Sequence, residues 1–352
     1  MDRERSQRFM QKVVGDVGTA MAAALVLVGD QAGLFKAMAG AGPLDAEALA
    51  ARAGIHPRYA QEWLAAMACA GYVDLDAQHD TFTLPDEHAA FLCDPSAETY
   101  LGGLFTGLPG LLGSAPRLAD AFARGDGIAF AEYGASMPVA LEQMNRAVYE
   151  KRLVQTWLPT MPRVLERLQA GGRAIDVGCG TGVVAVTLAK AFPKARIEAL
   201  DIDARSIALA RANAAQAGVD DNLRFIQAGA EALSDAPGYD LVTTFDVVHD
   251  LPDPLGVLQR ICAALAPEGR YLMVEPKVQD DLGENLANPF AKMLYAISCM
   301  HCVPQSLAQG GSGLGACWGP ARARQLAEAA GFGGFEVLPI RSPALAFYEL
   351  RA

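Results

Sequence analysis

The sequence carries little positive charge for its size, and this limits the partners that it can bind. Its 352 residues include 29 Lys and Arg against 40 Asp and Glu, which gives a formal net charge of −11. Phosphate binding draws its affinity from clustered Lys and Arg. We therefore expect a small-molecule partner and no nucleic acid.

The sequence also has no uninterrupted apolar run of the roughly 18–20 residues that a membrane span needs. The best candidate, residues 20–29, is shorter and is flanked by acids, so it predicts a core helix and no membrane partner. The mixed-charge start does not have the form of a signal peptide. Seven Cys without regular spacing do not make a disulfide framework, so reduced thiols and a cytoplasmic protein are expected.

The first part of the chain has the pattern of a winged helix. Short helices are expected at residues 32–40, 44–54 and 57–71, each ended by glycine, and alternating residues at 72–76 and 81–84 predict a hairpin. We assign residues 1–97 to this domain and residues 98–169 to a helical connector.

From residue 170 to residue 352 the pattern changes to alternating strands and helices. Apolar strands that alternate with helices imply a parallel sheet covered on both faces, which is a Rossmann-like α/β fold. Strands are expected at 174–177, 196–202, 223–228, 239–245, 271–275, 335–340 and 344–350, the last two antiparallel, and helices at 182–192, 204–217, 254–266 and 321–330. Residues 277–318 form an insertion.

A glycine-rich segment joins the first of these strands to the first helix. It has the spacing G-x-G-x-G, carried by Gly178, Gly180 and Gly182, with Asp176 before it and Thr181 within it. The dinucleotide-binding fingerprint has the spacing G-x-G-x-x-G, which would require a glycine at position 183, where this sequence has Val183. An acid beside the loop suits a cationic ligand such as S-adenosylmethionine and repels a pyrophosphate.

A second acid follows at the end of the next strand. Asp201 lies 25 residues after Asp176, where a carboxylate can accept both hydroxyls of a ribose. Ribose binding by a carboxylate occurs in both nicotinamide and S-adenosylmethionine sites, so Asp201 does not distinguish the two cofactors. The glycine spacing and the acid beside the loop favour S-adenosylmethionine.

The histidine after the fourth strand is a candidate general base. His249 and Asp250 lie in the segment Phe245–Asp253, at the carboxyl edge of the sheet where α/β folds bind ligands. An imidazole at such an edge is suited to proton transfer, although a lone histidine is more often structural.

Residues 171–352 resemble class I methyltransferases, whose first motif is carried by Asp176–Gly182. The resemblance implies S-adenosylmethionine as cofactor and a seven-stranded sheet. The cofactor residues that it implies, together with their neighbours at the sheet edge, are Asp176, Gly178, Gly180, Thr181, Gly182, Asp201, Ile202, Ala230, Glu231, Phe245 and Asp246. The acid that the family often has after the third strand is replaced by Ala230, followed by Glu231.

Nearly the whole chain is similar to small-molecule O-methyltransferases with an N-terminal winged helix. Their His-Asp-x-x-Asp segment matches residues 249–253, with the histidine as base, and their glutamate beside it matches Glu275. The resemblance implies O-methylation and a homodimer formed through the first domain. A second family glutamate falls near Cys317 and is missing, so N- or S-methylation stays open.

The insertion supplies candidate pocket residues. An apolar stripe at residues 288–303 is either core or a lid over the acceptor, and its members Met293, Tyr295, Met300 and Cys302 are the expected pocket residues. The glycine run 310–315 predicts a hinge or a tight backbone approach. Cys299, His301, Cys302 and Cys317 do not supply four well-spaced ligands, so no metal is expected.

Two other classes of protein compete with an active methyltransferase. Winged helices often read DNA, yet residues 36–94 carry three basic residues against nine acids, a surface that repels phosphate. A chain that binds the cofactor without turnover would look the same in sequence. We favour an enzyme that methylates a small apolar or aromatic acceptor.

Overall fold

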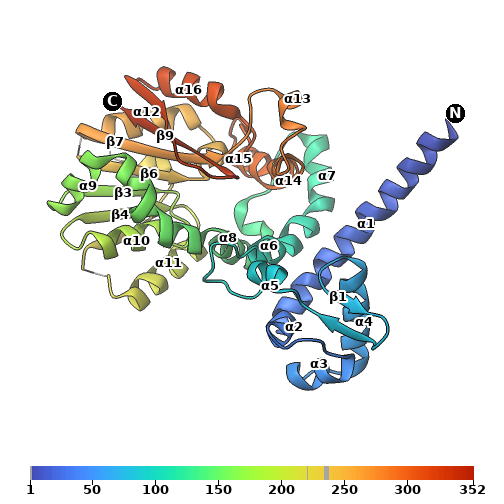
Figure 1. The fold of residues 1–352 in the computed structure, drawn as a ribbon. Coiled ribbons are helices and arrows are strands. Elements are labelled where there is room, and N and C mark those ends of the chain that lie inside the picture. Colours follow the sequence, from blue (N-terminus) through green and yellow to red (C-terminus); the bar gives the residue numbers. More distant parts are fainter. Residues whose placement is uncertain (1, 220, 234–237) are drawn as a thin grey trace. The chain divides into compact units, whose positions relative to one another are not determined.

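The computed structural model describes residues 2–219, 221–233 and 238–352, and the chain divides into two compact units (Figure 1). Unit 1 comprises residues 1–108 and 139–147, and unit 2 comprises residues 109–138 and 148–352. The helical segment expected as a connector is thus shared between both units. Helices α6 (Gly102–Gly113) and α8 (Ser136–Arg152) each belong partly to one unit and partly to the other.

Unit 1 holds the expected three helices and a two-stranded wing. The three expected helices are α2 (Leu34–Met38), α3 (Ala46–Ala53) and α4 (Pro57–Cys69), and a further helix, α5 (Asp86–Leu92), follows the wing. Asp45 caps α3 by accepting from the Ala48 N–H, so α3 begins two residues later than the expected residue 44, whereas α4, with proline in its first turn, begins at residue 57 as predicted. Strands β1 (Asp74–Asp76) and β2 (Thr81–Thr83) pair antiparallel.

Helix α1 (Arg3–Gln31) differs from the sequence-based expectation. Residues 20–29 are helical, but only Val26 and Gly29 of α1 are buried, where Gly29 lets the indole of Trp63 pack against the helix. The expected core helix is therefore mostly exposed. The whole of α1 is also long and apolar enough, by length and composition alone, to cross a membrane. The sequence-based search for an uninterrupted apolar run missed this, because a few charged residues interrupt the helix.

The seven-stranded sheet of unit 2 has the expected α/β architecture. Its order is β5-β4-β3-β6-β7-β9-β8, with the first five strands parallel and the last two pairings antiparallel. The strands are β3 (Arg173–Val177), β4 (Arg196–Asp201), β5 (Leu223–Gln227), β6 (Tyr239–Phe245), β7 (Leu265–Pro276), β8 (Gly334–Val337) and β9 (Leu345–Arg351). The expected Rossmann-like fold class is confirmed.

Helices cover both faces of this sheet (Figure 1). Alternate residues along a strand point to opposite faces, so Leu272 and Val274 of β7 join one core cluster while Tyr271 and Met273 join the other. Buried residues of α9 (Pro162–Gln169), α10 (Val183–Ala191) and α11 (Ala204–Ala217) lie in the first cluster, and those of α12 (Pro254–Ala264) and α16 (Gly319–Ala329) in the second.

Strand β7 is longer than the sequence predicts. It begins at Leu265, directly after α12, because Leu265 pairs with Tyr239 before an irregularity in register. Glu268 within this stretch has φ 64°, so the alternation expected of a strand is interrupted there. Because of this interruption, the alternating pattern predicts a strand only at residues 271–275 and misses the part that begins at Leu265.

The remaining elements of unit 2 are short and irregular. They include two π-helical turns, Leu153–Trp157 and Ser298–Cys302, the second of which lies in the insertion. The other elements are α7 (Ala115–Arg124), the 3₁₀ turns Phe130–Tyr133, Leu158–Thr160, Ala230–Ala232 and Val248–Asp250, α13 (Leu282–Asn285), α14 (Ala291–Ile297) and α15 (Val303–Ala308).

Candidate active site

The glycine loop leaves β3 with three glycines in left-handed backbone conformations. Gly178, Gly180 and Gly182 have φ values of 72°, 52° and 79°, which disfavour any other residue. A Cβ on Gly178 would lie 2.5 Å from Val247, and one on Gly182 would lie 2.8 Å from Phe225, whereas a Cβ on Gly180 would meet open space. The loop is therefore packed at both ends and leaves its middle open to a ligand.

Asp201 holds the open part of this loop. Its Oδ2 accepts from the Gly180 N–H at 2.8 Å, and its Oδ1 accepts from the Asp203 N–H at 2.8 Å. Burial raises the pKa of this carboxyl, with the backbone donors opposing the shift. The next residue, Ile202, is 58% exposed. A fixed carboxylate beside an exposed apolar side chain fits a ribose and the ring attached to it.

Asp176 lies beneath the loop and is only 2% exposed. It accepts from the Thr243 hydroxyl at 2.7 Å, and burial raises the pKa of its carboxyl to about 7. Thr181 is also buried, and its carbonyl accepts from Asn213 at 2.9 Å. A neighbouring cation would lower this pKa, because it stabilises the charged form of the carboxyl.

The other expected cofactor residues come from the ends of β5 and β6. The Ala228 N–H donates to the Asp201 carbonyl at 3.0 Å, which brings the turn with Ala230 and Glu231 beside the acid. Ala230 is buried and Glu231 exposed. At the end of β6, the ring of Phe245 packs 4.9 Å from that of Tyr149.

Asp246 has an unusual backbone conformation. Its φ is 56°, which is uncommon for a residue other than glycine and recurs at functional sites. Burial raises the pKa of its carboxyl to about 7, and Tyr149 forms a hydrogen bond with it. Tyr149 was missed in the sequence, since nothing local to it indicates proximity to residue 246.

His249 is oriented by Glu275, which lies in the neighbouring strand β7. Both side chains are buried, and the His249 Nδ1 hydrogen-bonds to Glu275 Oε2. The same carboxylate accepts from the Val248 N–H at 3.0 Å and from the Trp318 indole at 3.1 Å. With Nδ1 engaged, Nε2 is the ring atom left for proton transfer.

The Nε2 side of His249 faces Asp250 and Cys302. Asp250 Oδ1 is 3.4 Å from Nε2, and one ring nitrogen of His249, one carboxylate oxygen of Asp250 and the Cys302 sulfur lie within 4.8 Å of one another. Burial lowers the pKa of His249, but the charges of Glu275 and Asp250 outweigh burial and hold this pKa well above its ordinary value. The expected catalytic residues therefore form one cluster.

The four expected pocket residues have different surroundings. Cys302 alone among them belongs to the His249 cluster. The Tyr295 hydroxyl accepts from buried Asn285 at 3.1 Å, the Met300 carbonyl accepts from Tyr133 at 2.6 Å, and Met293 is half-buried in α14. Cys299 is exposed while Cys302 is buried, and all seven cysteines are free.

Cys317 and Trp318 occupy the region where the related O-methyltransferases carry their second glutamate. Trp318 binds Glu275, and burial raises the pKa of its neighbour Cys317 to about 11 while the charge of His249 lowers it. The glycine run closes tightly on this region, since the Gly315 N–H donates to the His249 carbonyl and a Cβ on Gly311 would lie 2.3 Å from Pro252. The glycines thus serve close backbone approach.

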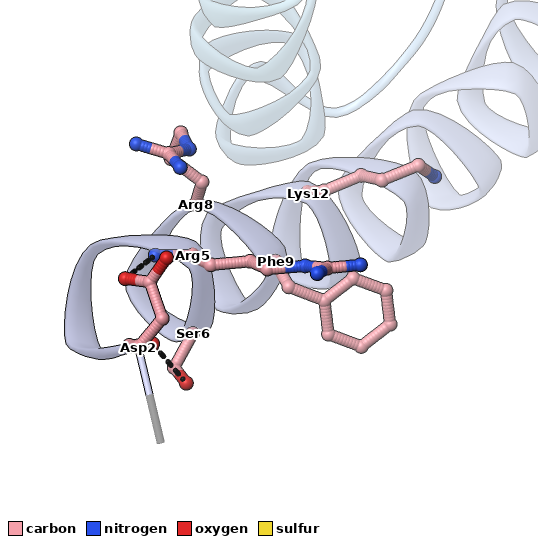
Figure 2. Close-up of a pocket in the computed structure, with 6 residues that line it drawn as sticks. All are labelled: Asp2, Arg5, Ser6, Arg8, Phe9 and Lys12. Atoms are coloured by element: carbon pink, nitrogen blue, oxygen red, sulfur yellow. Dashed lines mark hydrogen bonds between the residues drawn. The ribbon is translucent and has the colours of Figure 1, made fainter.

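A shallow depression elsewhere on the chain shows none of these features. Figure 2 shows its six lining residues, which are the N-cap of α1 and five residues of its first three turns: Asp2, Arg5, Ser6, Arg8, Phe9 and Lys12. Its hydrogen bonds belong to the start of the helix, such as the Arg5 N–H donating to Asp2. We assign it no function.

Comparison with known proteins agrees with this geometry. Residues 168–331 match a family model described as a methyltransferase domain, and residues 20–94 match one described as an Rv2258c-like winged HTH domain. The chain therefore combines a methyltransferase domain of the class I fold with a winged-helix domain. Its cofactor is S-adenosylmethionine, and the loop, Asp201 and Ile202 described above fit that molecule.

Three solved structures have the same fold over nearly the whole chain. Mitomycin 7-O-methyltransferase matches with a TM-score of 0.69, 21% identity and coverage of 99% of this chain and 100% of that one. Human N-acetylserotonin methyltransferase, solved with S-adenosylmethionine, matches with a TM-score of 0.67 and 18% identity, covering 100% of this chain and 98% of that one. An O-methyltransferase family protein from Burkholderia thailandensis matches with a TM-score of 0.69 and 15% identity, covering 97% of this chain and 98% of that one.

Curated relatives match over a shorter stretch. The ubiquinone biosynthesis O-methyltransferase of Bordetella parapertussis is 36% identical over 29% of this chain and 42% of that protein. The corresponding protein of Vibrio campbellii is 36% identical over 40% of this chain and 58% of that protein. The similarity thus spans about half the length of these relatives.

Proposed function

We propose that this protein transfers the methyl group of S-adenosylmethionine to a hydroxyl oxygen of a small apolar or aromatic acceptor, with His249 as general base. The observation that carries the proposal is the fixed imidazole. Glu275 engages Nδ1, so Nε2 faces the cluster with Asp250 and Cys302 at the carboxyl end of β6. Related O-methyltransferase names and folds support the same reaction.

In the proposed reaction the cofactor supplies an electrophilic methyl group on a positively charged sulfur. The acceptor oxygen forms a bond to this carbon as the carbon–sulfur bond breaks, and the electron pair of that bond stays on sulfur. The acceptor proton passes to His249 Nε2. Glu275 stabilises the imidazolium that results, and the surrounding residues hold the oxygen in line with the methyl group.

The electrostatics of His249 have a consequence for this step. The charges of Glu275 and Asp250 raise the pKa of His249 above its ordinary value, so the neutral imidazole that can accept a proton forms only as the pH rises through this raised pKa. The base form therefore grows as the pH rises through the raised pKa. A rate that increases with pH on the alkaline side of a normal histidine is expected.

The proposal is tested by methyl transfer from labelled cofactor to a panel of phenols, amines and thiols, followed by identification of the methylated atom. With the best hydroxyl acceptor, His249→Ala should lower turnover by about 10²- to 10⁴-fold. Affinity for S-adenosylhomocysteine should stay nearly unchanged. The control is His79→Ala, which removes an exposed histidine of the wing.

Two outcomes would redirect this assignment. Transfer to an amine or thiol that survives His249→Ala would favour N- or S-methylation, since those acceptors already present a lone pair. Cofactor binding without transfer to any member of the panel would favour a protein that binds the cofactor without turnover.

We also propose that unit 1 forms a homodimer through α1. Seven apolar side chains of this helix are exposed, among them Phe9, Val14 and Met21 at 65–67% exposure. Such a stripe on a soluble protein marks an interaction surface. Sedimentation should give a dimer for the wild type and a monomer for Val14→Glu with Met21→Glu, whereas Gln11→Glu, another exposed position of α1, should stay dimeric. Binding of the wild type to lipid vesicles would instead favour a membrane contact.

A further inference from the structure

Three side chains that can bind a metal ion converge at the carboxyl end of β6. His249 and Asp250 lie in the 3₁₀ turn Val248–Asp250, and Cys302 ends the π-helical turn Ser298–Cys302 of the insertion. One ring nitrogen, one carboxylate oxygen and the sulfur of these residues lie within 4.8 Å of one another. Two of the three side chains, His249 and Cys302, are buried. The fold therefore brings a nitrogen, an oxygen and a sulfur ligand together from two separate segments.

The nitrogen and the oxygen of this cluster already have the spacing of two zinc ligands. Asp250 Oδ1 lies 3.4 Å from His249 Nε2. Two ligands bound to one tetrahedral zinc at about 2.0–2.1 Å lie about 3.3 Å apart. Asp250 Oδ1 is also buried and forms no hydrogen bond with any described residue. Because an unsatisfied buried acceptor is unfavourable, a cation bound at this oxygen would stabilise it.

The other ring nitrogen of His249 is bound as metal-binding histidines require. Such a histidine donates its second N–H to a carboxylate or carbonyl, which fixes the tautomer and makes the ligand more basic. Here Nδ1 hydrogen-bonds to the buried carboxylate of Glu275. Glu275 is itself fixed by the Val248 N–H at 3.0 Å and the Trp318 indole at 3.1 Å. With the proton on Nδ1, the lone pair of the neutral imidazole lies on Nε2.

The types of ligand indicate which ion fits the cluster. A set of nitrogen, sulfur and oxygen suits zinc, whereas Mg²⁺ and Ca²⁺ prefer a shell of oxygen ligands. Three protein ligands leave the fourth position of a tetrahedral zinc to a water or another small molecule. Cys302 has to bind as a thiolate, so its proton passes to the solvent when the ion binds. The thiolate and the Asp250 carboxylate then balance the two positive charges of the ion.

We propose that His249 Nε2, a carboxylate oxygen of Asp250 and the Cys302 sulfur bind a zinc ion, and that the bound ion inhibits methyl transfer. The Nε2 lone pair can form a bond to the metal or take the acceptor proton, but it cannot do both at once. Zinc therefore competes with the proposed proton transfer. The binding site does not depend on the proposed O-methylation, whereas the inhibition rests on His249 as the base.

A cluster held by hydrogen bonds alone is the competing interpretation. In that arrangement the Cys302 thiol is a weak donor to His249 or Asp250 and keeps its proton. Burial raises the pKa of Cys302 to about 12, which favours the protonated thiol as long as no metal is bound. A metal site requires the thiolate instead. The state of this sulfur in the presence of a metal ion therefore separates the two interpretations.

The binding test uses the full chain, freed of metal by a chelator and titrated with Zn²⁺ in competition with a chromophoric chelator. One zinc should bind per chain with a dissociation constant of about 1 μM or lower. Cys302→Ser and Asp250→Asn should each weaken binding by at least about 100-fold, because loss of an outer partner of a ligand already costs about 10- to 100-fold. Cys299→Ser, an exposed cysteine of the same turn, is the control and should bind zinc as the wild type does.

Two further measurements connect the ion to the sulfur and to the reaction. Co²⁺ should give a thiolate-to-metal absorption band that Cys302→Ser lacks, with affinity for S-adenosylhomocysteine as the check that the variant is folded. With the best hydroxyl acceptor, Zn²⁺ should inhibit the wild type over the concentration range in which it binds, and a chelator should restore the rate. Mg²⁺ should neither bind to the cluster nor inhibit.

Several outcomes would overturn the metal site. A chain that binds no zinc, or zinc binding that survives unchanged in both ligand variants, would each do so. A Co²⁺ complex without the thiolate band would favour the hydrogen-bonded cluster. Stoichiometric zinc that leaves turnover unchanged or raises it would keep the site but contradict the inhibition, and with it the role of Nε2 as the base. Loss of turnover in His249→Ala without any zinc binding by the wild type would keep the base and reject the site, so the two proposals are separable.

Discussion

The two halves of the active site differ in how their polar atoms are satisfied. In the cofactor half, at β3 and β4, Asp201 binds two backbone N–H groups and Asp176 binds Thr243. In the acceptor half, formed by the ends of β6 and β7 and the turn Ser298–Cys302, Asp250 Oδ1 and His301 Nε2 form no hydrogen bond with any described residue. The cofactor half is therefore preorganised by the protein's own contacts, whereas the acceptor half keeps buried polar atoms without a hydrogen bond among the described residues.

The largest effect expected in the acceptor half comes from Glu275→Gln. Glu275 accepts from three donors, and a glutamine would turn an amide donor toward one of them. The His249 tautomer then reverses and Nε2 carries the proton, which should lower turnover by about 10²- to 10⁴-fold. Steady-state kinetics check this, together with a pH profile, because loss of the Glu275 charge should move the rising limb to lower pH.

The control for this variant is Glu336→Gln in β8, an exposed glutamate of the same unit. It should leave both the rate and the pH profile unchanged. A Glu275→Gln protein that binds S-adenosylhomocysteine normally and keeps most of its turnover would remove Glu275 from catalysis. The acceptor half would then depend on packing more than on charge.

The same contrast explains what could be predicted from the sequence. The cofactor half was predictable because Gly178, Gly180 and Gly182 lie in one short segment whose spacing follows from backbone geometry. Asp201 was placed because it ends the next strand. Tertiary context was not needed for either.

The acceptor half was predictable only in part. His249 and Glu275 end neighbouring strands, and their pairing could be inferred from that position. Trp318 joins them from a distant segment, and a π-helical turn shifts the side-chain register of Ser298–Cys302 in a way that apolar spacing does not reveal. The length of α1 and its exposure were likewise missed, because a sequence pattern does not say what covers an apolar face.

An intermediate effect is expected in the cofactor half on Asp201→Ala. The variant loses a carboxylate that can bind the ribose hydroxyls and also releases the Gly180 N–H that it holds. Affinity for S-adenosylhomocysteine should fall by about 1–3 kcal/mol, or about 5- to 150-fold. Calorimetry measures this, with Asp221→Ala, an exposed acid of the same unit, as the control. Unchanged affinity would exclude Asp201 from the site.

The smallest effect expected is a pH dependence of cofactor binding that arises from Asp176. Burial raises the pKa of this carboxyl from 3.8 to about 7, so its contribution to the stability of the free protein is present at acid pH and is lost as the pH rises through about 7. A bound cation reverses this trend, because it stabilises the ionised carboxylate.

The affinity for S-adenosylmethionine, relative to S-adenosylhomocysteine without the sulfonium charge, should therefore rise between about pH 6 and pH 8. If a single carboxyl releases one proton on binding, the ratio of the two affinities can change by at most about tenfold per pH unit. Asp246, whose carboxyl pKa is also raised to about 7 by burial, adds to the effect, so Asp176→Asn should reduce the pH dependence without abolishing it. Calorimetry in buffers of different ionisation enthalpy should detect proton release on binding at pH 7. A ratio of affinities that stays constant across this range would mean that neither carboxyl responds to the charge of the cofactor.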